Sequence, residues 1–125
     1  TNAYLCRAVQ EGIVFALGYG FQVFRELGLV SNVIRAGHAN MFLSEIFCET
    51  FANITNTTLE LYNTDGAQGA ARAAGVGANF YQNFEEAFHT LRCIKTYEPN
   101  PQQQPSYQQA FEQWQSILET QLPKQ

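Results

Sequence analysis

Residues 33–50 read VIRAGHANMFLSEIFCET, and the order of residue types in this stretch decides the fold class. Residues 33–37 favour a short strand, a turn follows, and an apolar periodicity then predicts a helix. Such a strand, turn and helix often receives a ligand, because the helix N-terminus offers free backbone N–H groups. Glycines usually line the turn, whereas Ala39, Asn40 and Met41 occupy it here. The stretch predicts an α/β unit and leaves open whether the turn binds a nucleotide or only connects two elements.

The remaining pattern predicts helices around two or three short strands. Residues from about 3 to 27 are apolar nearly all round a helix, which is typical of a helix sandwiched between layers. We expect Gly28 to end this helix. Further helices are expected at 43–54, 66–81 and 106–122, and a second strand at 57–62. A short helix and an extended piece are expected within 83–99. The helix after the turn has one apolar face. Two strands make a poor sheet alone, so further strands are expected upstream.

Composition limits the chain to one domain and narrows the choice of partners. The 125 residues are 46% hydrophobic but only 14% charged, which suggests that part of the surface is normally covered. The net charge of −4 and the scattered basic residues argue against nucleic acid. The longest apolar run, residues 12–24, is too short to cross a bilayer and contains three glycines, so it predicts a core helix rather than a membrane segment.

The reactive side chains form no catalytic pattern in this segment. His38 and His89 are the two histidines, and neither belongs to a nucleophile, base and acid grouping. The three cysteines lack metal-ligand spacing, so no metal site is expected, and we expect them to be reduced and mostly buried. Glu11 stands on an apolar helix with Arg7 one turn earlier, which predicts an ion pair.

The helix expected at 66–81 consists largely of glycine and alanine. Asp65 precedes Gln68 by three positions, which is the spacing of a capping box. Glycine in a helix interior costs roughly 1 kcal/mol relative to alanine. That cost is understandable if another backbone, or a ligand, must approach the helix closely. The chain also begins without Met and enters a helix at once, so we expect it to be a piece of a longer polypeptide.

Three motifs follow one another over about 115 residues. The first, RAVQEGIVFALGYGFQVFRELG (7–28), and the second, DGAQGAARAAGVG (65–77), resemble the Arg-Ala-x-x-Glu-Gly and Gly-Ala-x-Gly-Ala-Ala helices of the FGGY carbohydrate kinases. YEPNPQQQPSYQQAFEQW (97–114) is similar to the tail of the xylulose kinase branch. Each motif is weak alone, but their shared order and spacing are specific.

The resemblance implies the C-terminal part of an actin-like, ribonuclease-H-like ATPase lobe. Residues 1–125 would be a single partial domain, without the first strands of that lobe and without the N-terminal lobe. The family transfers a phosphoryl group from MgATP to a sugar, here D-xylulose. Its catalytic Asp and phosphate loops lie upstream, so the resemblance implies part of an adenosine site and no catalytic residue in this segment. An isolated segment should therefore be inactive.

The same resemblance places an ATP-binding loop on the opening turn. The family's Trp-x-Gln-x-x-Ala-Asp helix aligns with residues 47–53, which sets its Gly-Gly-Gly-x-Lys/Arg-Ser loop on residues 39–44. Nucleotide contacts are thereby implied for Ala39, Asn40, Leu43 and Ser44, and contacts from Asp65 and Gly66 are expected at the start of the next helix. A methyl group and an amide in place of glycines either narrow the pocket or replace backbone contacts with side-chain contacts. The Asp65–Gly66 helix start still offers backbone N–H groups to a ligand.

Two other functions stay open at this point. Another FGGY kinase, acting on gluconate, ribulose or glycerol, would share these motifs, because the sugar binds mainly to the other lobe. A non-catalytic helical interaction domain explains the low charge but not the ordered motifs. The family implies a cytoplasmic protein that uses ATP and Mg²⁺. Exposed apolar surface left by the absent strands would favour self-association, for example as a homodimer.

Overall fold

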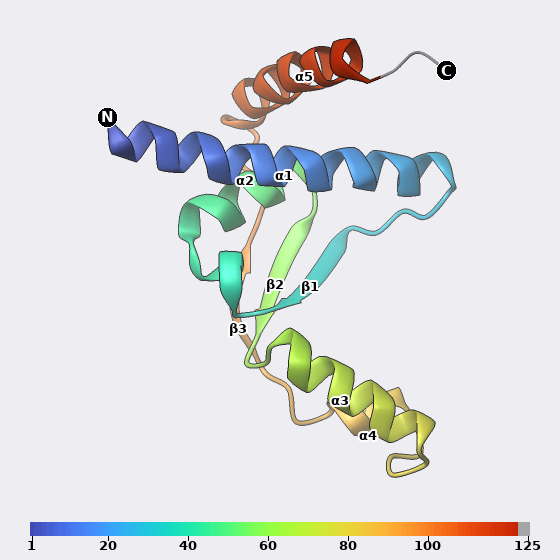
Figure 1. Cartoon of the computed structure of the whole chain (residues 1–125). Helices are drawn as coiled ribbons and strands as arrows, with labels where there is room; N and C mark the ends of the chain where they lie inside the picture. Colours follow the sequence, from blue (N-terminus) through green and yellow to red (C-terminus); the bar gives the residue numbers. More distant parts are fainter. Residues whose placement is uncertain (123–125) are drawn as a thin grey trace.

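The computed structural model describes residues 1–122 as five α-helices, one short 3₁₀ helix and three strands (Figure 1). In chain order they are α1 (Asn2–Glu26), β1 (Val33–Gly37), η1 (Asn40–Leu43), α2 (Glu45–Thr55), β2 (Thr58–Tyr62), α3 (Gly66–Gly77), α4 (Phe84–Phe88), β3 (Cys93–Tyr97) and α5 (Gln104–Gln121). The predicted order of elements is confirmed, and the extended piece near residue 95 is a third strand. The chain is therefore α/β and rich in helix, as expected.

The three strands form one mixed sheet in the order β1–β2–β3. β1 and β2 run parallel, with Val33 opposite Thr58 and Gly37 opposite Tyr62. β3 returns antiparallel to β2, with an irregularity between Leu61 and Tyr62. Because β1 and β2 are parallel and α2 connects them, their carboxyl ends meet at one edge of the sheet.

Helix α2 is the central layer of the molecule, since it lies between the sheet and the helices α1 and α5. The core combines apolar side chains from all three layers: Val14, Phe15, Phe47, Phe51, Leu59, Leu61 and Phe111. α1 crosses α2 closely at Gly18, where an added Cβ would lie 2.6 Å from Ile54 Cγ2. A glycine at this position therefore permits the short separation of the two helices.

The expected roles of α1 and α2 are reversed in the structure. α1 buries only Val14, Phe15 and Gly18, so the prediction of a sandwiched first helix is wrong within the described chain. α2, expected to have one apolar face, is buried along most of its length, including the polar residues Thr50 and Asn53. Their side chains donate to carbonyl oxygens four residues earlier, at 2.7 and 2.8 Å. These local hydrogen bonds let polar residues enter the core, and an apolar count cannot detect them.

Residues with positive φ end two of the helices and follow the end of a third. Gly28 has φ +80, and the N–H groups of Gly28 and Leu29 donate to Arg25 O and Phe24 O, both at 2.9 Å. This is a Schellman motif, which confirms Gly28 as the C′ residue. Helix α3 stops at Gly77, earlier than the predicted residue 81, because the chain turns at Asn79 (φ 58).

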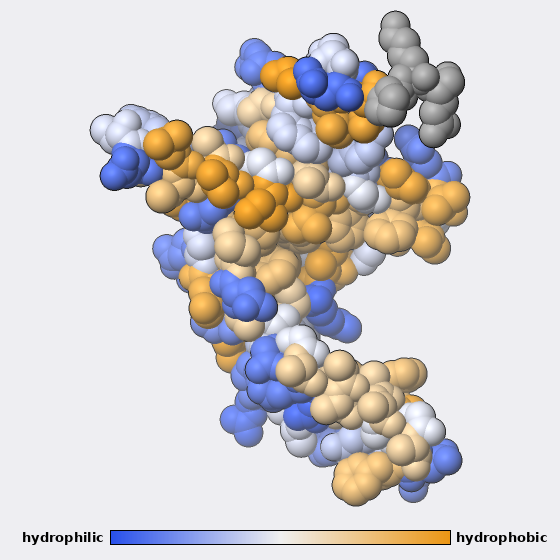
Figure 2. Space-filling view, viewed as in Figure 1, coloured by the Kyte–Doolittle hydropathy of each residue, from blue (hydrophilic) through white to orange (hydrophobic). Residues whose placement is uncertain are grey.

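The outer face of α1 is apolar and exposed, which Figure 2 shows as orange along this helix. Val9, Phe24 and Leu27 are 64%, 50% and 70% exposed. No helix among residues 1–122 is both long and apolar enough to cross a membrane. Much of the exposed apolar surface of this weakly charged chain therefore lies on one face of α1.

The cysteines and the first predicted ion pair can also be placed. Cys48 is buried, whereas Cys6 and Cys93 are exposed, so the expectation of mostly buried thiols is wrong. All three are free. Burial raises the pKa of the Cys48 thiol to about 11. The pair between Arg7 Nε and Glu11 Oε1 is confirmed at 2.7 Å.

Candidate functional site

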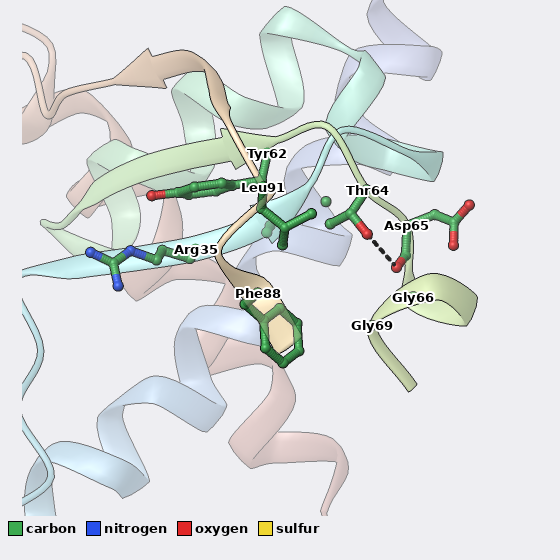
Figure 3. Close-up of a pocket in the computed structure, with 10 residues that line it drawn as sticks. Arg35, Tyr62, Thr64, Asp65, Gly66, Gly69, Phe88 and Leu91 are labelled. Atoms are coloured by element: carbon green, nitrogen blue, oxygen red, sulfur yellow. Dashed lines mark hydrogen bonds between the residues drawn. The ribbon is translucent and has the colours of Figure 1, made fainter. Parts of the chain in front are cut away.

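A cavity of about 540 Å³ lies where the carboxyl ends of β1 and β2 meet the start of α3 (Figure 3). Its lining residues come from four segments: Arg35, Ala36 and Gly37; Tyr62, Thr64 and Asp65; Gly66 and Gly69; Phe88 and Leu91. In open α/β sheets, ligands usually bind at this edge, beyond the carboxyl ends of the strands. Its volume lies within the usual range for small-molecule sites.

Gly37 allows the two sides of this edge to approach each other. A Cβ on Gly37 would lie 2.5 Å from Thr64 O and 3.1 Å from Asp65 Cα. The His38 N–H donates to Tyr62 O at 2.9 Å, and the Thr64 N–H donates to the same carbonyl at 2.8 Å. The end of β1 and the linker between β2 and α3 are thus held in direct contact.

The interior of the cavity is suited to a flat, weakly polar group. The aromatic rings of Tyr62 and Phe88 and the side chain of Leu91 contribute apolar surface. Gly66 and Gly69 place bare backbone on the α3 side, and a Cβ on either would meet no atom within 4 Å. Gly66 and Gly69 therefore leave open space at the cavity, and the close approach of a ligand to them stays a prediction.

Asp65 changes the expected chemistry of the α3 N-terminus. Its Oδ1 accepts the Gln68 N–H at 2.8 Å, and its Oδ2 accepts from Gln68 Nε2 at 3.2 Å. These hydrogen bonds lower the pKa of the Asp65 carboxyl, the backbone bond contributing most. A carboxylate already occupies the place that a phosphate would take at this helix start. At this helix start, a hydroxyl or amino donor is therefore favoured over an anion.

A charged network borders the cavity on the open face of the sheet. Glu60 Oε2 accepts from Arg35 Nε at 3.0 Å and from the Tyr62 hydroxyl at 2.9 Å. The Arg35 hydrogen bond, followed by that of Tyr62, lowers the pKa of Glu60. The bond to Glu60 in turn raises the pKa of Tyr62. The network orients Tyr62, whose phenol ring lines the cavity beside Leu91 (Figure 3).

The opening turn keeps its strand, turn and helix geometry without glycine. Asn40 adopts φ 53, a left-handed conformation that asparagine tolerates better than most residues. Ala39, at φ −151, is extended and lies just before η1. The amide residue thus supplies a conformation for which glycine is the default.

Ser44 has a structural role at the end of the same turn. Its Oγ accepts the Phe47 N–H at 3.4 Å as the N-cap of α2, and donates to Gln10 Oε1 at 2.6 Å. Ser44 therefore joins α2 to α1. Capping α2 is a sufficient structural reason for a serine at this position.

Only part of the predicted site residues lies at the cavity. Asp65 and Gly66 line it, whereas Ala39, Asn40, Leu43 and Ser44 are absent from its lining. Their segment starts two residues beyond Gly37 and continues the β1 edge. The sequence reading missed Gly37, Tyr62, Phe88 and Leu91. Gly37 could have been predicted, because a glycine as the last residue of a strand indicates a close approach. Phe88 and Leu91 line the cavity only because the chain returns toward the sheet before β3.

The two histidines make local contacts instead of a catalytic grouping. His38 is exposed and joins Tyr62 through its backbone, and His89 Nδ1 lies 2.6 Å from Glu86 O. Within residues 1–122, no three His, Cys, Asp or Glu side chains are close enough together to hold a metal ion. Among the described residues, the cavity lining therefore contains neither a catalytic grouping of these histidines nor a cluster of metal ligands.

The chain is similar to sugar kinases over nearly its whole length. The L-xylulose/3-keto-L-gulonate kinase of Escherichia coli strain K12 is 30% identical over 94% of the chain, and the xylulose kinase of Bacillus subtilis strain 168 is 30% identical over 91%. The crystal structure of xylulose kinase from Rhodospirillum rubrum superposes with a TM-score of 0.76 at 19% identity, over 96% of this chain and 25% of that one. No family model matches the chain.

These similarities confirm the resemblance to carbohydrate kinases and the expected fold class. The chain spans about a quarter of the length of the relatives, 24% and 23% of the two kinases. Three of the lining residues, Asp65, Gly66 and Gly69, belong to the segment that carries the Gly-Ala-x-Gly-Ala-Ala motif.

Proposed function

We propose that the chain is the C-terminal part of a kinase of the FGGY family, and that its cavity holds the adenosine of ATP. The observation that carries this proposal is the cavity itself, which combines two aromatic rings, bare glycine backbone, the Asp65 carboxylate and the guanidinium side chain of Arg35, which is paired with Glu60. An adenine ring fits the apolar interior, and a ribose hydroxyl or the exocyclic amine can donate to Asp65. Residues 1–125 would then form a single partial domain, the nucleotide side of a larger enzyme.

The phosphates would leave the cavity in the direction away from Asp65. The capped, negatively charged start of α3 disfavours them, so the triphosphate needs donors from elsewhere in the enzyme. No cluster of three His, Cys, Asp or Glu side chains lies in the described part, so Mg²⁺ would be held mainly by the phosphates and by residues elsewhere in the enzyme. The role of this chain in the reaction is therefore to hold the nucleoside, and residues 1–125 alone should not turn over ATP.

The reaction proposed for the whole enzyme is transfer of the ATP γ-phosphate to D-xylulose. The names of the relatives support a ketose as acceptor, although this chain would not contact the sugar. A gluconate, ribulose or glycerol kinase is the alternative, and a sugar panel with the intact enzyme distinguishes them. We propose a cytoplasmic location by analogy with such kinases.

The loop at residues 39–44 remains a proposed contributor to the same nucleotide site. Only His38 separates the loop from Gly37 at the end of β1, so Ala39 and Asn40 are close in sequence to a residue that lines the cavity. Leu43 and Ser44 are proposed to act through the position of this loop, given the bonds of Ser44 to Phe47 and Gln10. Asp65 and Gly66 are the proposed direct contacts.

Filling the cavity tests the proposal. Gly69→Leu adds a side chain where an added Cβ meets no atom within 4 Å, and it removes a glycine from a helix. We expect the intact protein to stay folded and its ATP affinity to fall by about tenfold or more, because the new side chain occupies the apolar space. Gly12→Leu, on α1 with equally free space, is the matched control and should bind ATP like the parent. Equal affinity of both variants in calorimetry would overturn the assignment.

A further inference from the structure

The helical hairpin α3–α4 is attached to the sheet by two linkers, residues 63–65 and 89–92. Its helices pack on each other, and Arg72 donates to the Ala87 carbonyl and to the Thr90 hydroxyl. α3 buries no residue, and Figure 1 shows the hairpin beyond the sheet, away from α1 and α5. Few side chains therefore fix the hairpin against the rest of the chain, and its position depends on the two linkers.

The cavity has one wall on each side of these linkers. Arg35, Gly37 and Tyr62 belong to the sheet, whereas Gly69, Phe88 and Leu91 belong to the hairpin or follow it. A small rotation of the hairpin about the linkers would change the distance between the two walls. The shape of the cavity is thus set by whatever holds the linkers together.

Asn63 connects the two linkers through a reciprocal pair of hydrogen bonds. Its N–H donates to Arg92 O at 3.1 Å, and its Oδ1 accepts the Arg92 N–H at 2.6 Å. The pair extends the β2–β3 ladder beyond Tyr62 and Cys93, just after the irregularity in that ladder. A side-chain oxygen here takes the part that a backbone carbonyl has in a regular ladder.

The neighbours of this pair in sequence line the cavity. Thr64 follows Asn63, and Leu91 precedes Arg92. Asn63 and Arg92 do not line the cavity themselves, and Asn63 is exposed. The pair therefore holds one cavity residue from each linker at a fixed separation without contacting the space between them.

We propose that Asn63 is a positioning residue for the ligand cavity, and that its side-chain bond to Arg92 sets the hairpin against the sheet. This inference rests on the proposed nucleotide site. Loss of the bond frees the linker at residue 92, Leu91 loses its fixed position, and the bound ligand must then order the hairpin at the expense of affinity.

The experiment compares Asn63→Ala with Asn63→Asp in the intact protein. Alanine removes the acceptor, whereas aspartate keeps an oxygen that can accept the Arg92 N–H. We expect ATP to bind Asn63→Ala about three- to tenfold more weakly in calorimetry, as for the loss of one hydrogen bond. Asn63→Asp should recover most of the affinity. KM for ATP should rise in Asn63→Ala while KM for the sugar stays at the parent value.

Amide hydrogen exchange separates positioning from general loss of structure. In Asn63→Ala, exchange should quicken at Arg92 and in α3 and α4, and α2 should keep its protection. Asn32→Ala is the matched control, an exposed asparagine at the opposite end of the sheet, and should behave like the parent.

Each result decides a different claim. ATP binding of Asn63→Ala at the parent affinity, or equal weakening by Asn63→Asp, would overturn the role of Asn63 and leave the nucleotide site standing. Rapid exchange spread over α2 would also overturn it, because the residue would then support the whole fold. No ATP binding by the parent protein would overturn the proposed function, and the positioning role with it.

Discussion

Gly37 lies so close to Thr64 that a Cβ on the glycine would be 2.5 Å from the Thr64 carbonyl oxygen. Because the neighbour is backbone, it cannot move away as a flexible side-chain end can. The end of β1 and the linker to α3 are therefore in contact only if residue 37 is glycine. This contact fixes the separation between the end of β1 and the linker on the cavity wall, and a substitution at residue 37 tests its importance.

Gly37→Ala should separate β1 from the linker and weaken nucleotide binding. We expect an affinity for ATP lower by about tenfold in the intact protein, since the ligand would touch only one wall of the cavity. Isothermal calorimetry measures it. Gly77→Ala, at the far end of α3 with no atom within 4 Å of its Cβ, should bind like the parent. Parent-like binding by Gly37→Ala would show that the contact does not shape the site.

The crossing of α1 and α2 predicts a stability effect at a second glycine. Gly18→Ala places a methyl 2.6 Å from Ile54 Cγ2 and 3.5 Å from the Phe111 ring. Overpacking of this kind costs about 1–3 kcal/mol. Gly20→Ala, on the exposed side of the same helix, should instead stabilise by roughly 0.5–1 kcal/mol through helix propensity. Denaturant unfolding compares the two, and equal stability would mean that the helices do not meet at Gly18.

Asn40 should tolerate glycine and reject a β-branched residue. Its φ of 53 is left-handed, a conformation that costs roughly 1–2 kcal/mol for residues other than glycine and asparagine. Asn40→Gly should leave the unfolding midpoint nearly unchanged, and Asn40→Val should lower stability by about that cost. If both variants unfolded at the same denaturant concentration, the turn would have another conformation.

The Glu60 network predicts a dependence of stability on pH. The pKa of Glu60 is lowered in the folded chain, chiefly by its bond to Arg35, so the folded state binds fewer protons than the unfolded state. Its stabilisation is complete above the unfolded pKa, near 4.5, and disappears as pH falls through the lower folded value. Between pH 6 and pH 3, the free energy of unfolding of Glu60→Gln should fall less steeply than that of the parent. Identical slopes would exclude a stabilising network.

The outer face of α1 should make residues 1–125 associate when they are produced alone. Val9 is 64% exposed within a continuous apolar stripe, so Val9→Glu should shift the segment toward monomer in sedimentation. Ile117→Glu, on α5 and 63% exposed, is the control and should associate like the parent. A parent segment that sediments as a monomer would show that this face does not drive association.

The sequence predicted local structure well because the local signals agreed. Gly28, the Asp65–Gln68 cap and the short strands each depend on residues close in sequence, and all appear in the structure. The third strand was foreseen only as an extended piece, because CIKTY gains its partner β2 from residues more than thirty positions earlier.

Layer order and the cavity were harder to predict, for a physical reason. Which helix is central depends on packing between distant segments, so α1 and α2 exchanged their expected roles. The polar residues Thr50 and Asn53 made α2 look partly exposed in the sequence, but their side chains donate to carbonyl oxygens of α2 itself and can therefore be buried. Phe88 reaches the cavity only through the α3–α4 hairpin, a contact that no spacing in the sequence announces.

The most direct test of the nucleotide site is a crystal structure of the intact protein with bound ADP. We predict that the adenosine lies between Tyr62 and Phe88, over the glycine backbone at Gly66, with a hydroxyl or amino group donating to Asp65. Adenosine bound away from these residues, for example against Ser44 at the start of α2, would contradict the proposed site.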